Sequence, residues 1–235
     1  MPRKARILVS NYPHHIVQRG HNRQAVFIMD DDYRYYLENL KEWKNKLGVK
    51  LYAWCLMTNH VHIIVEPGDD ASTVSELMKR VAGRQTAYVN KQENRSGSLW
   101  EGRYKASPIQ RDNYLLACCR YVEMNPVRAN MVTGPRQYRW SSYRERVDLI
   151  KSSMLDFDLT YLGMAFNKLQ RIERYKRYIQ KGASDKEVAL LRNAWSRNQL
   201  TGNACFVDEI EKRAGYRIEN RGRGNPRGKS LKLFK

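Results

Sequence analysis

The segment Met57–Glu66, which reads MTNHVHIIVE, constrains the fold of this chain more than any other. Valine or isoleucine at 61, 63 and 65 alternates with His60 and His62, and this period of two predicts a β-strand. Residues two apart on a strand point to one side, so the two imidazoles share a face while the apolar side chains enter a core. Neutral imidazoles can bind a divalent cation. A His-X-His triplet on its own is more often a pair of ordinary histidines, so the rest of the chain must decide.

The charge of the chain indicates its class of partner. Lysine and arginine outnumber aspartate and glutamate by 43 to 24, so the 235 residues carry a formal net charge of +19. This excess favours nucleic acid, with a membrane surface as the second choice. We find no run of roughly 18 apolar residues, no secretory signal and no P-loop, so we expect a cytoplasmic protein with no membrane partner and no nucleotide cofactor. Four cysteines without a C-x-x-C spacing argue against a zinc ribbon.

The periodicity of the first 145 residues predicts the order strand, helix, hairpin, helix, strand, helix. Strands are expected at 13–19, 49–57, 60–66 and 99–111. Helices are expected at 30–47, 73–89 and 112–124, the last ending where Asn125 precedes Pro126. This order predicts an α+β fold, a ferredoxin-like antiparallel sheet with helices packed on one face.

The C-terminal part has a different character. Helical patterns at 172–181, 184–198 and 206–214 predict a mostly helical C-terminal extension over 148–216, after a first domain of residues 1–147. Residues 217–235 hold seven basic side chains against one acidic, and are expected to form a disordered tail that contacts nucleic acid. A merely solvated charged end is an equally good interpretation of this segment.

The third predicted helix carries a second group of candidate residues. Tyr114, Cys118, Tyr121 and Asn125 share one helical face, and Tyr121 and Asn125 lie one turn apart. A phenol, with a pKa of about 10, is a poor nucleophile unless a metal polarises its target or another group takes its proton. Two histidines and one amide oxygen would hold Mg²⁺ or Mn²⁺ weakly and leave room for phosphate oxygens. Spacing alone does not select Tyr121 over Tyr114, or over a tyrosine that only packs in the core.

Several segments occur together in an order typical of one family. They are HIVQRG and NRQ within 15–24, MTNHVH at 57–62, LWEGR at 99–103, RYVEMNPVRA at 120–129 and WSSY at 140–143. Over about residues 5–145 the chain resembles the REP-associated tyrosine transposases, relatives of the single-tyrosine HUH transposases of small insertion sequences. The joint pattern is highly specific, whereas the histidine triplet alone is not.

The resemblance implies an HUH nuclease core and a metal-dependent endonuclease and strand transferase that cuts single-stranded DNA near hairpins. The tyrosine of the motif falls on Tyr121, which would attack a phosphodiester, keep the 5′ phosphate and release a 3′-OH. The metal-binding histidines fall on His60 and His62. The polar residue that completes the metal site falls on Asn125, and the cofactor would be Mg²⁺ or Mn²⁺.

The resemblance also implies the partner, a single-stranded DNA with hairpin structure. The candidate DNA contacts are basic residues of the first domain, although each taken singly is more often an ordinary surface charge: Arg19, Arg23, Arg80, Arg84, Arg103 and Lys105. His14, His15 and His21 have no ligand spacing and are interpreted as structural or DNA-facing.

Two questions stay open at this stage. Related insertion-sequence enzymes act as dimers that exchange helices, whereas the extension would let a monomer act alone. The alternative function is a non-catalytic binder of structured DNA or RNA on the same scaffold, and a rolling-circle initiator or relaxase would use the same chemistry.

Overall fold

The computed structural model describes residues 6–219. Within that range the chain forms a four-stranded antiparallel sheet in the order β2-β3-β1-β4. The strands are β1 His14–Arg19, β2 Lys50–Met57, β3 His60–Glu66 and β4 Lys105–Pro108. The predicted hairpin of β2 and β3 is present. The strand expected over 99–111 is confined to the four residues of β4. Earlier in that segment, Trp100 forms only an isolated bridge with Gly20.

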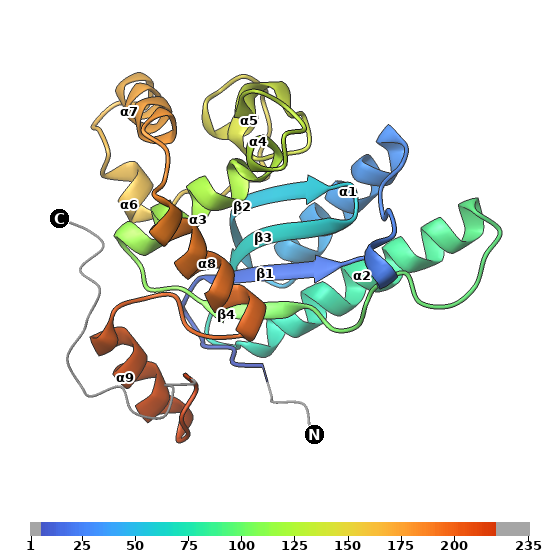
Figure 1. The fold of residues 1–235 in the computed structure, drawn as a ribbon, viewed down its shortest axis with the longest axis horizontal. Helices are drawn as coiled ribbons and strands as arrows, with labels where there is room; N and C mark the ends of the chain where they lie inside the picture. Colours follow the sequence, from blue (N-terminus) through green and yellow to red (C-terminus); the bar gives the residue numbers. More distant parts are fainter. Residues whose placement is uncertain (1–5, 220–235) are drawn as a thin grey trace.

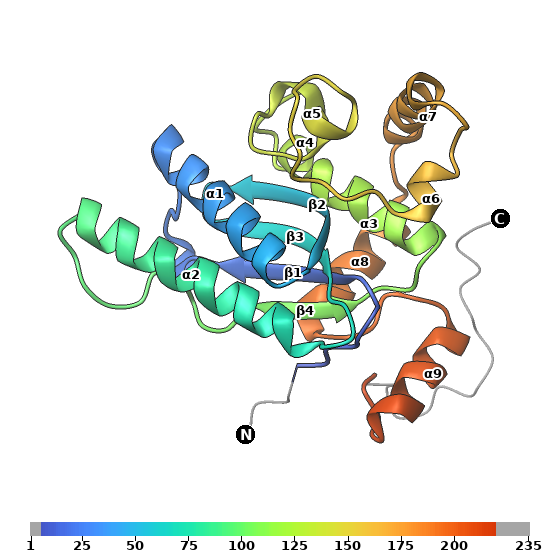
Figure 2. The same cartoon turned by 180° about the vertical axis from the view of Figure 1, so that it is seen from behind.

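Helices cover both faces of this sheet. α1 and α2 lie on one face, and α3 and α8 lie on the other (Figures 1 and 2). None of the helices in the described part of the chain is long and apolar enough to cross a bilayer. The helices are α1 Asp30–Lys46, α2 Ser72–Gln92, α3 Asn113–Glu123, α4 Asn125–Arg128, α5 Tyr143–Arg146, α6 Leu159–Leu162, α7 Lys168–Gln180, α8 Asp185–Arg197 and α9 Ala204–Ala214, with 3₁₀ turns at His21–Arg23 and Pro135–Gln137.

The predicted α+β class, its antiparallel sheet and the helical C-terminal region are confirmed. The expectation that the helices pack on one face is wrong. Leu56 and Ile63 point into the core under α1 and α2, while their neighbours Cys55 and Ile64 point into a second buried cluster under α3. Because both faces of β2 and β3 carry apolar side chains, each face needs a helical cover.

A β-bulge in β2 sets which side chains face α3. The register with β3 shifts between Leu51 and Ala53, so Leu51 belongs to the α1 and α2 core whereas Ala53 belongs to the α3 cluster. Simple alternation would have placed both residues on one face. The bulge therefore decides on which face of the sheet the side chains before it, such as Leu51, are buried.

Buried charges join the C-terminal extension to α3. Arg120 donates two hydrogen bonds to the Glu187 carboxylate at 2.6 and 2.8 Å. Glu123, fully buried, accepts from Arg146 Nε at 2.9 Å and from the Tyr175 hydroxyl at 2.7 Å. Charges removed from water in this way require paired partners, so α3 is fixed to α7 and α8.

The extension also pairs with the outer edge of the sheet, beside β4. Thr201 N–H donates to the Pro108 carbonyl, and Gln110 N–H donates to the Thr201 carbonyl, each at 2.8 Å. Further on, Ile218 is buried in a cluster with α9, so ordered packing reaches into the predicted tail. Residues 220–235 of that tail lie outside the described residues.

Candidate active site

Three histidine rings lie together on the α3 side of the sheet. His60 and His62 leave β3 on the same face, with ring centroids 5.0 Å apart. His15, from the neighbouring strand β1, lies with its Nε2 2.8 Å from His62 Nδ1, so that one imidazole donates to the other. From the sequence His15 is interpreted only as structural or DNA-facing, because it is the register of β1 on β3 that brings it beside His62.

Burial keeps these imidazoles neutral near pH 7. It lowers the pKa of His60 to about 4 and that of His15 to about 3, with smaller effects of Arg19 and Arg128 respectively. Burial, followed by the two neighbouring histidines, also lowers the pKa of His62 well below its ordinary value. A neutral imidazole retains one nitrogen lone pair, which is the form that binds a metal ion.

His60 has a defined tautomer. Its Nδ1 lies 2.6 Å from the Asn59 Oδ1, and because an amide oxygen can only accept, Nδ1 carries the proton. The lone pair is then on Nε2. A histidine whose second nitrogen is engaged in this way is the usual arrangement at a protein metal site.

Tyr121 on α3 faces the histidines. Its ring centroid lies 5.7 Å from that of His15 and 6.0 Å from that of His62, and its side chain is only 4% exposed. The structure therefore brings together His60, His62 and Tyr121, which lie on two elements far apart in the sequence. The sequence pattern from Tyr114 to Asn125 could not by itself establish this contact.

Trp195 on α8 covers the site, where it contacts both Tyr121 and His62. Its Nε1 donates to the Tyr121 hydroxyl at 3.2 Å, and its ring centroid lies 5.6 Å from that of His62. Figure 1 shows α8 crossing the sheet beside α3. No motif in the sequence connects this tryptophan to the first domain, so sequence reasoning missed it.

Asn125 and Arg128 follow Tyr121 along the chain, and Arg128 lies against its ring. α3 ends before Asn125, as the following proline predicts, and Asn125 begins α4. Its Oδ1 accepts from Arg128 at 2.5 Å, and its buried Nδ2 has no partner within residues 6–219. The Arg128 guanidinium lies over the Tyr121 ring, 4.1 Å from its centroid.

A basic cavity of about 500 Å³ opens beside His60. Three predicted DNA contacts line it, namely Arg19, Arg103 and Lys105. Glu101 also lines it and pairs with Arg19 at 2.5 Å; that hydrogen bond lowers the pKa of the Glu101 carboxyl. The cavity thus places positive charge next to the histidines.

The structure does not bring all predicted DNA contacts to this site. Arg23 lies near it, with its carbonyl accepting from Asn59, the residue before His60. Arg80 and Arg84 lie on α2, over the opposite face of the sheet. They pair with acidic residues there, Arg80 with Glu76 at 2.5 Å and Arg84 with Glu42 at 2.6 Å.

The donor atoms of His60 and His62 are of a type that binds divalent metal ions. Within residues 6–219 no three His, Cys, Asp or Glu side chains are grouped to hold a cation. His60 and His62 nevertheless offer two neutral nitrogen donors on one rigid strand. A hard cation at this position would need oxygen ligands from an amide, water or phosphate to complete its coordination.

Comparison with known proteins assigns the family. The family model for IS200-like transposases matches residues 8–125, which is half of the chain, and the protein belongs to this family. A search of curated proteins finds no match.

Two solved structures match this chain. A REP-associated tyrosine transposase bound to a REP hairpin is 15% identical, with a TM-score of 0.56 over 68% of this chain and 99% of that one. A Deinococcus radiodurans R1 protein assigned as a transposase is 19% identical, with a TM-score of 0.36 over 55% of this chain and 92% of its own. The first likeness confirms the fold that the sequence resemblance implied.

Proposed function

We propose that this protein is a metal-dependent single-stranded DNA endonuclease and strand transferase that cuts beside DNA hairpins in the cytoplasm. The observation that carries this proposal is the contact of a tyrosine with a histidine pair, since the Tyr121 ring lies 6.0 Å from that of His62. Membership of a transposase family and a similar fold that binds a REP hairpin support the choice of DNA. The net charge of +19 suits a phosphate backbone.

The chemistry is a transesterification. Tyr121 Oη forms a bond to phosphorus, the bond from phosphorus to the 3′ oxygen breaks, and the 5′ phosphate stays on the tyrosine. The phenol proton passes to water in the cavity, and the released 3′ oxygen takes a proton from water. The phosphotyrosine keeps roughly the bond energy of the phosphodiester, so the returning 3′-OH can rejoin the strand without a nucleotide cofactor.

The surrounding residues prepare each part of this reaction. The Arg128 guanidinium beside the ring stabilises the phenolate as the proton leaves. His60 and His62 would hold Mg²⁺ or Mn²⁺, which when bound supplies a Lewis acid that polarises the scissile phosphate. Asn125 would add its Oδ1 as a third ligand, and for this it must exchange its hydrogen bond with Arg128.

The arrangement favours action by a monomer. The tyrosine and both histidines come from one chain, and the buried pair of Arg120 and Glu187 holds α3 against α8 of the same chain. Exchange of α3 between two copies would first have to separate that buried pair, which could re-form only between the two chains.

A non-catalytic binder of structured nucleic acid is the second candidate. It is favoured by the closure of the site, since Tyr121 is 4% exposed and its hydroxyl is bonded to Trp195. This candidate predicts hairpin binding without cleavage under any divalent metal.

Strand-specific labelling of a panel of DNA hairpins, incubated with Mn²⁺, tests the proposal. A 3′-labelled strand should become covalently bound to protein, whereas a 5′-labelled strand should be released as a fragment with a free 3′-OH. Tyr121→Phe should give no adduct, and Tyr114→Phe is the matched control that should still give one. An adduct formed by Tyr121→Phe, or an adduct on the 5′-labelled fragment, would contradict the assignment.

A further inference from the structure

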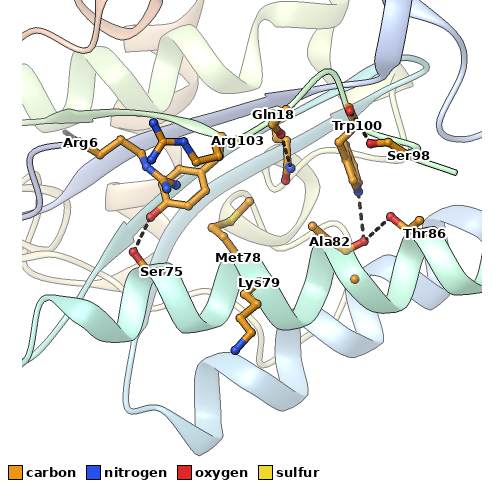
Figure 3. Close-up of a pocket in the computed structure, with 13 residues that line it drawn as sticks. Arg6, Gln18, Ser75, Met78, Lys79, Ala82, Thr86, Ser98, Trp100 and Arg103 are labelled. Carbon is orange, nitrogen blue, oxygen red and sulfur yellow. Dashed lines mark hydrogen bonds between the residues drawn. The ribbon is translucent and has the colours of Figure 1, made fainter. Parts of the chain in front are cut away.

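A second cavity lies on the face of the sheet that α2 covers, opposite the face that carries the histidines. It has a volume of about 580 Å³ and lies between α2 and the segment 98–104 (Figure 3). Gly102 and Arg103 line both this cavity and the one beside His60, so this segment is the wall between them. A DNA strand that leaves the first cavity over Arg103 reaches the second directly.

Gln18 brings an unpaired polar atom to this cavity. It alternates on β1 with Val17 and Arg19, which line the cavity beside His60, so its side chain points the other way. Gln18 is 7% exposed, and its Nε2 donates to the Gly102 carbonyl at 3.3 Å. Its Oε1 has no partner within residues 6–219. A buried amide oxygen of this kind needs an explanation, and a ligand that donates an N–H supplies one.

Aromatic and small residues shape the rest of the cavity. The Trp100 Nε1 is bonded to the Ala82 carbonyl at 3.1 Å and the Tyr104 hydroxyl to Ser75 at 2.9 Å, so the polar atoms of both rings are already satisfied. Figure 3 shows Gln18 and Trp100 approaching from the strand side, opposite the helix. The apolar surfaces that remain suit a flat ligand.

Gly83 keeps the cavity open on the side of α2. Glycine inside a helix is less favourable than alanine, so its presence in a 21-residue helix needs a reason. A Cβ placed at Gly83 would meet no atom within 4 Å, and the residue lines the cavity. A larger side chain here would fill the space without disturbing the helix.

Basic side chains line this cavity, and no acidic side chain among the described lining residues neutralises them. The Arg6 guanidinium lies 4.0 Å from the Tyr104 ring centroid, and Arg103 has no hydrogen-bond or ion-pair partner within residues 6–219. Of the described residues that line the cavity, none is acidic. Lys79 contributes less, because it points away from the cavity and pairs with Glu76 at 3.6 Å (Figure 3).

We infer that this cavity binds one unpaired nucleobase of the DNA strand. An N–H on the edge of the base donates to Gln18 Oε1, and the flanking phosphates lie against Arg6 and Arg103. The aromatic lining and the buried amide suit a base, while the cationic rim suits the phosphodiester on each side of it. The inference rests on the proposed function and adds a base-reading site on the face of the sheet that does not carry the tyrosine.

The test scans a DNA hairpin that binds the protein, chosen from the labelled panel. Each unpaired nucleotide of its flanks is replaced in turn by an abasic site, and Kd is measured by fluorescence anisotropy without divalent metal. An abasic site at one position should raise Kd about tenfold. Gly83→Leu should raise the Kd for the intact hairpin by a similar factor, and in this variant the abasic site at that position should cause no further loss of binding. Ala87→Leu, one turn along α2 and outside the cavity, is the matched control and should keep both values.

The outcomes separate this inference from the proposed function. The inference is overturned if no abasic position matters, or if the penalty persists in Gly83→Leu. A neutral methylphosphonate linkage tests the phosphate instead of the base. The inference is also overturned if Gly83→Leu removes the Kd penalty of this linkage but not that of an abasic site, because a phosphate would then be the ligand. Hairpin binding with this coupling but without covalent adducts would contradict only the proposed chemistry. A protein that binds no hairpin would contradict both.

Discussion

The two faces of the sheet bury side chains to a similar depth but with different chemistry. Under α1 and α2 the buried residues include Ile16 and Ile63, which are apolar and fully enclosed. Under α3 and α8, the same two strands present His15 and His62, which meet Tyr121. Because side chains alternate along a strand, β1 and β3 serve a packed core and a reactive site at the same time. Burial under α1 and α2 therefore contributes stability, whereas burial under α3 and α8 also keeps imidazoles neutral by lowering their pKa.

The largest effect is expected from the charges that fix the reactive face to the extension. Glu123→Ala leaves the buried Arg146 guanidinium without its carboxylate, so the free energy of unfolding should fall by about 3–5 kcal/mol. Urea denaturation measures this. Glu173→Ala, which removes an exposed pair with Lys176, is the control and should change little. Equal effects of the two variants would show that the reactive face gains no stability from its buried charges.

Two neighbours on β3 offer the sharpest contrast between the faces. Ile63→Ala should lower the free energy of unfolding by about 2–5 kcal/mol and leave cleavage by folded protein unchanged. His62→Ala should lower the cleavage rate at least about 100-fold, because a metal ligand is lost. Denaturation curves and initial rates on the same preparations separate the two. If His62→Ala cleaves normally, the reactive face is misassigned.

Acid should destabilise the protein through its buried histidines. Burial lowers the pKa of His14 to about 4, below its ordinary value near 6.5. As pH falls through 6.5 the unfolded chain takes up a proton that the folded protein refuses, so stability decreases from there down to about pH 4. His14→Gln should flatten this decrease in urea titrations at pH 7 and pH 4.5. An unchanged slope would mean that His14 is not a source of acid sensitivity.

A moderate gain of rate is expected when the Tyr121 hydroxyl is released. Trp195→Phe removes the N–H that donates to this hydroxyl while keeping an aromatic ring over the histidines. The lost bond contributes about 0.5–1.5 kcal/mol, so adduct formation should become roughly two- to tenfold faster. Single-turnover kinetics with a labelled hairpin measure the change. A slower variant would show that Trp195 positions the nucleophile instead of holding it back.

The smallest effect concerns the charges around each face. Arg103→Gln should reduce the slope of log K against log salt for single-stranded DNA by about 0.7, the value for one phosphate contact. Arg84→Gln should leave the slope unchanged, since Arg84 already pairs with Glu42. Equal slopes for the two variants would mean that the predicted contact at Arg103 is not made.

The sequence predicted the parts of the site that are local in the chain. Alternation placed His60 and His62 on one face of a strand, and the family pattern pointed to Tyr121. It could not supply His15 or Trp195, whose hydrogen bonds span 47 and 74 residues and depend on strand register and on how α8 packs. The bulge at Leu51 and the second helical layer were missed for the same reason, because alternation carries no information about long-range packing.

The most direct test of the reactive face is mass spectrometry of the trapped protein–DNA adduct after trypsin and nuclease digestion. Trypsin cleaves after Arg111, Arg120 and Arg128, so Tyr114 and Tyr121 fall in different peptides. We predict a nucleotide phosphate on the peptide 121–128, whose single tyrosine is Tyr121. A phosphate on the peptide 112–120, or on any residue outside the α3 side of the sheet, would contradict the account.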